Sequence, residues 1–270
     1  MRTRRGAASV FALTATVVAL TACAPAGGAA VRLPPENAVP DYQLGAAYEP
    51  PDGVTVVARD RTADPADGVY SICYLNAFQT QPGELADWPG ELILRSADGP
   101  LFDPDWPGEA LLDTSTETKR QAIADIVVPW IRDCAEAGFD AVEFDNLDTY
   151  TRSGGALTFG DNLALGRVLV GAAHEAGLAA AQKNAAEDAR VLRDEGRFDF
   201  AISEECAAYD ECAAYLDVYG EHVVNVEYGD PVAFAAACEG GRMPRASVLR
   251  DRDLVAPDDA AYVFELCAAD

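Results

Sequence analysis

The chain has 270 residues, of which half are hydrophobic, and a formal net charge of −25. This length and composition fit one large globular domain and exclude a disordered chain. They also argue against a nucleic acid or an anionic membrane surface as a partner, because phosphate groups need a basic face, whereas a cationic partner would be attracted.

The first 22 residues have the features of an export signal. Three arginines precede the apolar stretch AASVFALTATVVAL, which is too short to span a bilayer comfortably. The stretch ends in LTAC, which resembles a bacterial lipobox and implies cleavage before Cys23 and lipidation of its thiol. Cleavage of an ordinary signal peptide nearby is the alternative. We therefore expect an exported protein that is lipid-anchored at the outer face of the cell membrane or secreted.

Residues 23–40 are rich in Ala, Gly and Pro, which is typical of a flexible tether. No second linker divides the remainder, so residues 41–270 are expected to form one domain. Within it, apolar runs alternate with helical patterns. We expect strands at 41–45, 54–60, 69–78, 140–146, 178–184, 198–206, 222–230 and 244–253, and helices at 115–138, 161–176, 209–219 and 231–239.

Eight strands with intervening helices indicate an α/β fold, the (β/α)₈ or TIM-type barrel. Several of the runs are apolar almost throughout, as strands buried on both faces should be. Only short loops separate the first three strands, so the helices of the first third are expected to be reduced. An open doubly wound sheet is the alternative.

The cysteines fit an exported domain. With Cys23 lipidated, six are left, and an even number in this setting predicts disulfides. We expect the pairs Cys73–Cys134, Cys206–Cys212 and Cys238–Cys267, with free buried thiols as the alternative. A metal site is not expected, because the sequence has no C-x-x-C and only two histidines. No cofactor motif was found either.

The segment GFDAVEFDNLDTY, residues 138–150, places four carboxylates around a predicted strand: Asp140, Glu143, Asp145 and Asp148. Active sites of such barrels lie at the carboxyl ends of the strands, and most predicted strands here end in charged or amide residues. Alternation sends Glu143 and Asp145 to the same side. Either a structural network with Lys183 or Asn184, or catalysis, would explain acids in such a position.

No other nucleophile system competes with these acids, since the chain has no G-x-S-x-G, phosphate-binding loop or dinucleotide fingerprint. Paired carboxylates on an exported barrel indicate glycoside hydrolysis. In addition, YQLGAAYEPPDGVTVVARDR, YSICYLNAFQTQPGE, WPGEALLD, GFDAVEFDNLDTY, AQKN and ISEECAAYDEC, taken in this order, resemble the glycoside hydrolase family 114 domain from about residue 41 to 267.

This resemblance implies a (β/α)₈-type barrel and endo-α-1,4-polygalactosaminidase activity on a partly N-acetylated galactosamine polymer. The catalytic carboxylates it implies are Asp145 of FDN and the first acid of SEEC, Glu204. We assign Asp145 as the nucleophile and Glu204 as the general acid/base of a retaining enzyme. The sequence departs from the family at VEFDN, where VEPDN is common, and in a short loop after the first strand.

A galactosamine polymer is cationic, so further acids and aromatic rings at the barrel mouth are expected to bind it. Trp106 would supply a flat face for a sugar ring. The other substrate-binding candidates are Tyr74, Glu143, Asn146, Asp148, Lys183, Asn184, Glu205, Glu227 and Tyr228. Two alternatives remain at this stage: a catalytically silent sugar-binding lipoprotein and a hydrolase of another glycan.

Overall fold

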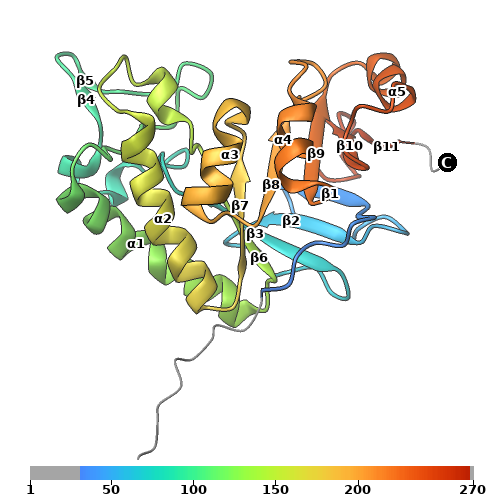
Figure 1. The fold of residues 1–270 in the computed structure, drawn as a ribbon, viewed down its shortest axis with the longest axis horizontal. Coiled ribbons are helices and arrows are strands. Elements are labelled where there is room, and N and C mark those ends of the chain that lie inside the picture. Colours follow the sequence, from blue (N-terminus) through green and yellow to red (C-terminus); the bar gives the residue numbers. More distant parts are fainter. Residues whose placement is uncertain (1–30, 268–270) are drawn as a thin grey trace, which may run out of the picture.

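The computed structural model describes residues 31–267, and its nine-stranded sheet curls into a nearly closed barrel (Figure 1). Eight strands are parallel, and the ninth, β11, runs antiparallel to β10. In spatial order they are β1 (Pro40–Gln43), β2 (Val56–Asp60), β3 (Tyr70–Asn76), β6 (Ala141–Asp145), β7 (Ala179–Lys183), β8 (Phe200–Glu204), β9 (Val223–Tyr228), β10 (Ala246–Arg250) and β11 (Phe264–Leu266). The predicted TIM-type barrel is confirmed.

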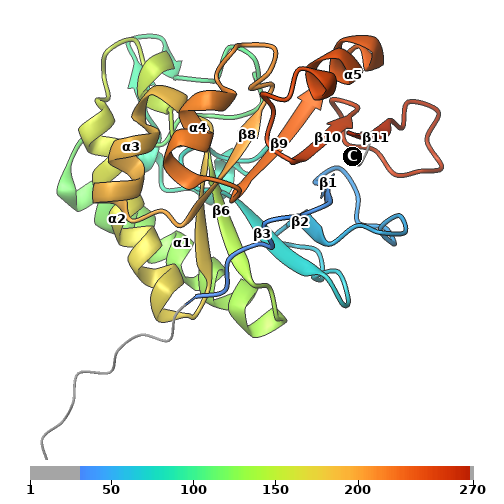
Figure 2. The same ribbon diagram turned by 45° about the vertical axis from the view of Figure 1, so that its right-hand side comes forward.

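The helices gather around the later strands, as Figures 1 and 2 show. They are α1 (Glu117–Ala137), α2 (Phe159–Glu175), α3 (Ala189–Val191), α4 (Cys212–Tyr219) and α5 (Pro231–Glu239). Within the described residues no helix joins β1 to β2 or β2 to β3, so the expected reduction in the first third is confirmed. The long connection from β3 to α1 contains the small hairpin β4 (Arg95–Ser96) and β5 (Gly99–Pro100) and two 3₁₀ turns, Leu85–Asp87 and Gly90–Leu92. Further short turns are Thr149–Arg152, Ala186–Asp188 and the π-helical Leu192–Gly196.

Helix α1 shows how local sequence sets an element. The Thr116 side chain accepts a hydrogen bond from the backbone N–H of Lys119 and caps the amino end. Gly138 ends the helix with φ of 100°, a left-handed conformation that glycine adopts without a Cβ clash. Ile123, Val127 and Ile131 recur every fourth residue, so they form one buried face against the sheet.

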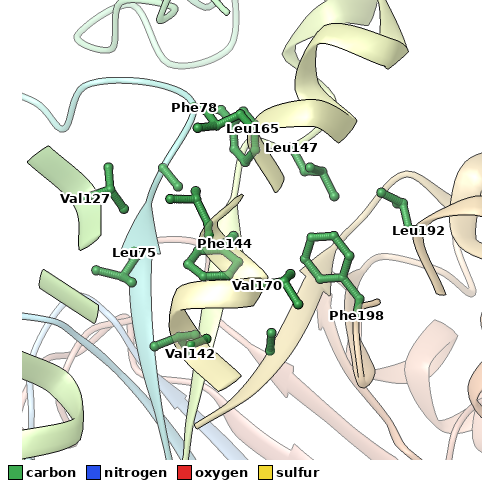
Figure 3. Packing of buried hydrophobic residues seen from close by; sticks show 14 of the residues in the cluster. Leu75, Phe78, Val127, Val142, Phe144, Leu147, Leu165, Val170, Leu192 and Phe198 are labelled. Atoms are coloured by element: carbon green, nitrogen blue, oxygen red, sulfur yellow. The ribbon is translucent and has the colours of Figure 1, made fainter. Parts of the chain in front are cut away.

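Two apolar layers separate the inside of the barrel from its outside. The outer layer lies between the strands and the helices and includes Leu75, Val127, Phe144, Val170 and Phe198 (Figure 3). The rings of Phe144 and Phe198 meet edge to face, with centroids 6.4 Å apart. The inner layer fills the lower part of the barrel and consists of the alternate residues of the same strands, among them Ile72, Ala181, Phe200, Ile202 and Val248. The residues above this inner layer therefore face the mouth.

A buried ion pair lies where the first and last parallel strands approach each other. In the described part of the chain no backbone ladder joins β10 to β1. Instead, the Arg250 guanidinium of β10 donates to Asp41 Oδ1 of β1 at 2.8 Å and to the backbone carbonyl of Tyr42. The side chains of Arg250 and Asp41 are fully buried, so the contact links the two strands inside the protein.

The structure contains the three expected disulfides. Cys73–Cys134 ties β3 to α1, and Cys206–Cys212 closes the short loop between β8 and α4. Cys238–Cys267 ties α5 to the segment after β11. The pairing predicted from the sequence is thus the pairing found.

The predicted export signal and Cys23 lie outside the described residues. The described end of the predicted tether, residues 31–39, contacts the barrel: the Tyr70 hydroxyl donates to the carbonyl of Arg32 at 2.7 Å, and the Arg32 guanidinium pairs with Asp140. This segment therefore belongs to the ordered domain rather than to a free tether. Among the described residues, no helix is long and apolar enough to cross a membrane.

Candidate active site

Polar side chains replace apolar ones at the carboxyl ends of the barrel strands. By strict alternation from the inner layer, β3 presents Tyr74, β6 presents Glu143 and Asp145, and β7 presents Lys183. The strands β8 and β9 present Glu204 and Tyr228 in the same way. All of these residues except Glu143 line a cleft of about 640 Å³, which we call the main cleft. It is located where TIM-type barrels place their active sites.

Lys183 lies at the centre of this group. Its ammonium nitrogen is 3.1 Å from Glu143 Oε1, 3.3 Å from Asp145 Oδ1 and 3.2 Å from Glu204 Oε2. Burial acts to lower the pKa of Lys183, but Asp145 and Glu204, together with Tyr42 and Glu143, raise it above its usual value. The side chain is 2% exposed, so a buried, charged lysine holds three carboxylates together.

Asp145 is held in place through both of its carboxylate oxygens. Its Oδ1 accepts from Lys183 and, at 2.8 Å, from the backbone N–H of Asn146. Its Oδ2 accepts from the Tyr74 hydroxyl at 2.6 Å. Burial, followed by the charge of Asp145, raises the pKa of Tyr74, so this hydroxyl stays protonated and remains a donor. The side chain of Asp145 is 17% exposed and can still meet a ligand in the main cleft.

Glu204 has a matching set of contacts on the other side of Lys183. Its Oε1 accepts from the Tyr228 hydroxyl at 2.7 Å, and its Oε2 accepts from Asn184 Nδ2 at 3.2 Å. Burial, followed by the charge of Glu204, raises the pKa of Tyr228. With 28% of its side chain exposed, Glu204 is the more open of the two acids.

The shared lysine limits the separation of the two carboxyl groups. Because one oxygen of each lies 3.3 and 3.2 Å from the same nitrogen, these oxygens can be no farther apart than about 6.5 Å. That limit equals the lower end of the range of inverting glycosidases, about 6.5–9.5 Å, and retaining enzymes use about 5–5.5 Å. This upper bound on one pair of oxygens is compatible with the distance that retaining enzymes use.

Asparagines after two of the strands turn the chain back toward the cleft. Asn146 and Asn184 have φ of 63° and 50°, a left-handed conformation that asparagine adopts more readily than most residues. Asn184 then bonds Glu204 through both its amide nitrogen and, at 2.8 Å, its oxygen, which accepts from the Glu204 backbone N–H. Asn146 Nδ2 donates to Asn76 Oδ1 at 2.9 Å. These two substrate-binding candidates line the main cleft as expected.

Glu143 lies beneath the cleft rather than in it. Its side chain is 0% exposed, and its Oε1 accepts from the Tyr42 hydroxyl at 2.6 Å. Burial, and to a smaller extent the charge of Asp145, raise its pKa to about 7 against the opposing effect of Lys183. Its second oxygen is buried without a hydrogen-bond partner. The expectation that Glu143 binds substrate is therefore corrected, whereas the expected network with Lys183 is present.

The expectation that Glu227 binds substrate is also corrected. Glu227 is the neighbour of Tyr228 in β9, so alternation places its side chain outside the barrel. There it accepts from the backbone N–H of Ala207 at 2.8 Å and from Asn225 at 3.0 Å. Glu205 instead follows β8 and borders a hollow of about 360 Å³ beside the main cleft, which we call the side hollow.

The main cleft is also lined by two residues, Glu109 and Arg152, that the sequence analysis did not name as site residues. Glu109, from the connection between β3 and α1, accepts from Asn76 Nδ2 at 2.9 Å. Burial, and to a smaller extent Asp145 and Asp103, raise the pKa of Glu109 to about 7. Arg152 bonds both Asn146, at 2.7 Å, and Asp148, at 2.7 Å. The presence of Glu109 in the WPGEALLD motif was the only signal for any of these contacts.

Aromatic rings and one arginine form the rim. Trp106 is 46% exposed and lines the main cleft, as expected for a sugar platform. The Arg252 guanidinium lies over its ring at 5.9 Å and over the ring of Tyr228 at 5.7 Å, and it is 3.4 Å from Glu205 Oε2. The rim thus joins the loops after β3, β8 and β10.

Acidic residues outnumber basic ones around both hollows. The main cleft is lined by eight acids and three bases, and all three bases are already paired with acids. The side hollow shares Asp105, Asp148, Asn184 and Glu204 with it and adds three further acids, Glu187, Glu205 and Glu211, and no base. A continuous, strongly negative groove therefore passes Glu204. No group of His, Cys, Asp and Glu in residues 31–267 is arranged to hold a metal ion.

Comparisons with known proteins show the family of this chain and relatives with the same fold. A sequence profile of glycoside-hydrolase family GH114 matches residues 21–270. The crystal structure of Aspergillus fumigatus Ega3 in complex with galactosamine superposes with a TM-score of 0.73 at 20% identity, covering 89% of this chain and 100% of that one. The glycoside hydrolase domain of PelA from Pseudomonas aeruginosa superposes with a TM-score of 0.56 at 14% identity, covering 84% and 98%. A search of curated proteins found no match. Since the profile matches nearly the whole chain, the protein belongs to glycoside-hydrolase family GH114 and is a glycoside hydrolase.

Proposed function

We propose that the protein is an exported, retaining endo-glycosidase that cleaves α-1,4-linked, partly N-acetylated galactosamine polymers. The observation that carries the proposal is the placement of two partly exposed carboxylates, Asp145 and Glu204, on either side of Lys183 in an acidic cleft at the barrel mouth. One oxygen of each acid lies within about 6.5 Å of the other, which is compatible with the separation in retaining enzymes.

In the first step the Asp145 carboxylate, held in position by Lys183 and by two further hydrogen bonds, attacks the anomeric carbon. The glycosidic carbon–oxygen bond breaks, and the leaving oxygen takes the proton of Glu204. In the second step the Glu204 carboxylate takes a proton from water. The water oxygen then bonds to the anomeric carbon, and the ester bond to Asp145 breaks, which restores both carboxyl groups.

The charge of the groove supports a cationic substrate. Unacetylated galactosamine units carry ammonium groups, and Asp105, Asp148 and Glu205 offer carboxylates along the groove. The relative solved with galactosamine shares the fold at low identity, which makes this sugar a natural first candidate. Trp106 offers an exposed face for a ring. A groove that extends from the main cleft into the side hollow suits an endo-acting enzyme, since a chain can lie on both sides of the bond that is cut.

We place the enzyme outside the cell, held by a lipid on Cys23. The three disulfides support export, because such bonds persist in oxidising compartments. The LTAC motif supports the lipid.

A substrate screen with active-site variants tests the proposal. Purified protein is incubated with α-1,4-linked galactosamine polymers of graded acetylation, a glucosamine polymer and a neutral galactan, and released reducing ends are measured. We expect cleavage of the galactosamine polymers alone. Asp145→Asn and Glu204→Gln should each remain folded by circular dichroism and lose nearly all cleavage, whereas Asp210→Asn, a fully exposed surface control, should not. Cleavage of another polymer would replace the substrate, and binding without cleavage by the unaltered protein would favour a sugar-binding protein instead.

A further inference from the structure

One cation serves more acceptors than it can fully satisfy. Lys183 Nζ donates hydrogen bonds to Tyr42 at 3.0 Å and to Asp145 Oδ1 at 3.3 Å. Glu143 and Glu204 lie within 3.2 Å of the same nitrogen as ion pairs. An ammonium has three N–H donors for these four oxygens. Lys183 therefore donates a directed hydrogen bond to Asp145, whereas it interacts with Glu204 as an ion pair at a similar distance.

We propose that Lys183 supports Asp145 in the free enzyme and passes its hydrogen bond and charge to Glu204 when Asp145 becomes glycosylated. Lys183 would thus be a positioning residue that times the change of Glu204 from acid to base, rather than a substrate ligand. This inference rests on the proposed double displacement by Asp145 and Glu204.

The two steps of the reaction need opposite behaviour from Glu204. In the first step Glu204 must carry a proton. The Lys183 hydrogen bond is then directed at Asp145, so Glu204 has only the ion-pair contact with this lysine. Once Asp145 is an ester, it has no charge to attract the ammonium. Glu204 Oε2, 3.2 Å away, is then the nearest ionisable group on the cleft side, so its ionised form is favoured when it must accept a proton.

The remaining groups around Lys183 do not take over this role. Tyr42 of β1, Tyr74 of β3 and Tyr228 of β9 have raised pKa values, chiefly through burial, and stay neutral. Glu143 of β6 is fully buried and faces Lys183 from below. With a pKa of about 7, it competes for the lysine charge mainly above neutral pH. The transfer to Glu204 should therefore be most complete below pH 7.

The test removes the cation without leaving an extra buried charge. Lys183→Met alone leaves Glu143 buried without its cationic partner, which can prevent folding above neutral pH. The main variant is therefore the double Lys183→Met, Glu143→Gln, which removes both ionisable groups of this buried pair. Glu143→Gln alone and Lys183→Arg are compared with it. The substrate is an aryl α-glycoside of a galactosamine oligomer, whose leaving group departs without needing the proton of Glu204. Aryl release then reports the first step, and intact-mass spectrometry reports glycosyl-enzyme waiting for the second.

We expect the double variant to slow deglycosylation about 100-fold, the lower range for a general base. Aryl release should slow less, because Asp145 loses Lys183 but keeps its hydrogen bonds from Tyr74 and the Asn146 backbone. Glycosyl-enzyme should accumulate as a burst, and the pH profile of deglycosylation should move to higher pH than in Glu143→Gln. Lys183→Arg should recover part of the loss. Equal slowing of both steps, or an unchanged pH profile without accumulation, would overturn the inference.

The variant Asp145→Asn separates the two claims. If Asp145→Asn abolishes aryl release while the double variant shows no burst, the role of Lys183 is wrong and the proposed function stands. If Asp145→Asn keeps normal turnover and the unaltered enzyme never carries a sugar on Asp145, the proposed function itself fails, and the inference fails with it.

Discussion

Replacing Glu143 by Gln should change how the stability of the protein depends on pH. The folded protein raises the pKa of this carboxyl from 4.5 to about 7, chiefly because the side chain is completely buried. Between these two pH values the folded state holds a proton that the unfolded state has lost. Since the native state binds more protons there, the free energy of unfolding must fall as pH rises through this interval.

The size of the effect follows from the shift. One pKa unit corresponds to about 1.4 kcal/mol, so a shift of this size corresponds to about 3 kcal/mol. Glutamine has the shape of the protonated acid and does not titrate. Its amide NH₂ group can take the position of Oε2, the glutamate oxygen that has no hydrogen-bond partner. The free energy of unfolding of Glu143→Gln, relative to that of the unaltered protein, should thus rise by about 3 kcal/mol from pH 4.5 to pH 8. The similar shift of Glu109 is present in both proteins and cancels in the difference.

Guanidinium unfolding followed by circular dichroism at pH 4.5, 6, 7 and 8 measures this difference, with all disulfides intact. A difference that stays flat across the series would mean that Glu143 is ionised in the folded protein throughout. A difference that falls with rising pH would mean that the attraction of Lys183 outweighs burial. Either result would refute the reasoning.

Further predictions concern the disulfides, the charge and the lipid. Replacing both cysteines of Cys73–Cys134, which closes a long loop, should lower the free energy of unfolding by about 4 kcal/mol, against about 2 kcal/mol for the short Cys206–Cys212 loop; equal losses would contradict the loop-length argument. The kcat/KM on deacetylated polymer should fall as salt is raised, because attraction is screened over about 8 Å at physiological ionic strength, and fully acetylated polymer should respond little; equal responses would refute electrostatic steering. Cys23→Ser should move the protein from the membrane to the soluble fraction of fractionated cells, and continued membrane association would remove the lipid proposal.

Sequence patterns located the eight barrel strands because buried parallel strands are apolar nearly throughout. Strand β11 and the short turns between β7 and β8 were not predicted, since elements of three to five residues carry no clear period. Alternation correctly placed Glu143 and Asp145 on one side. Applied to Tyr228, the same rule would have placed Glu227 outside.

The residues that the sequence missed reach the site through tertiary contacts. Tyr42 of β1 meets Glu143 of β6, 101 positions away, only because the curled sheet brings the inward faces of these two strands together across the barrel. Glu109 and Arg152 come from connections rather than strands, where no periodicity fixes the direction of a side chain. The full burial of Glu143 was likewise not visible, because strand alternation gives the face of a residue and not its depth.

The stereochemistry of the first product tests the central claim most directly, because a double displacement keeps the configuration of the cut bond, whereas a single displacement by water inverts it. Proton NMR of a galactosamine oligomer digest, recorded within the first minutes and before mutarotation, shows which anomer is released. The geometry predicts the α anomer as the first product. Initial release of the β anomer would show a single displacement by water and would contradict the assignment of Asp145 as nucleophile.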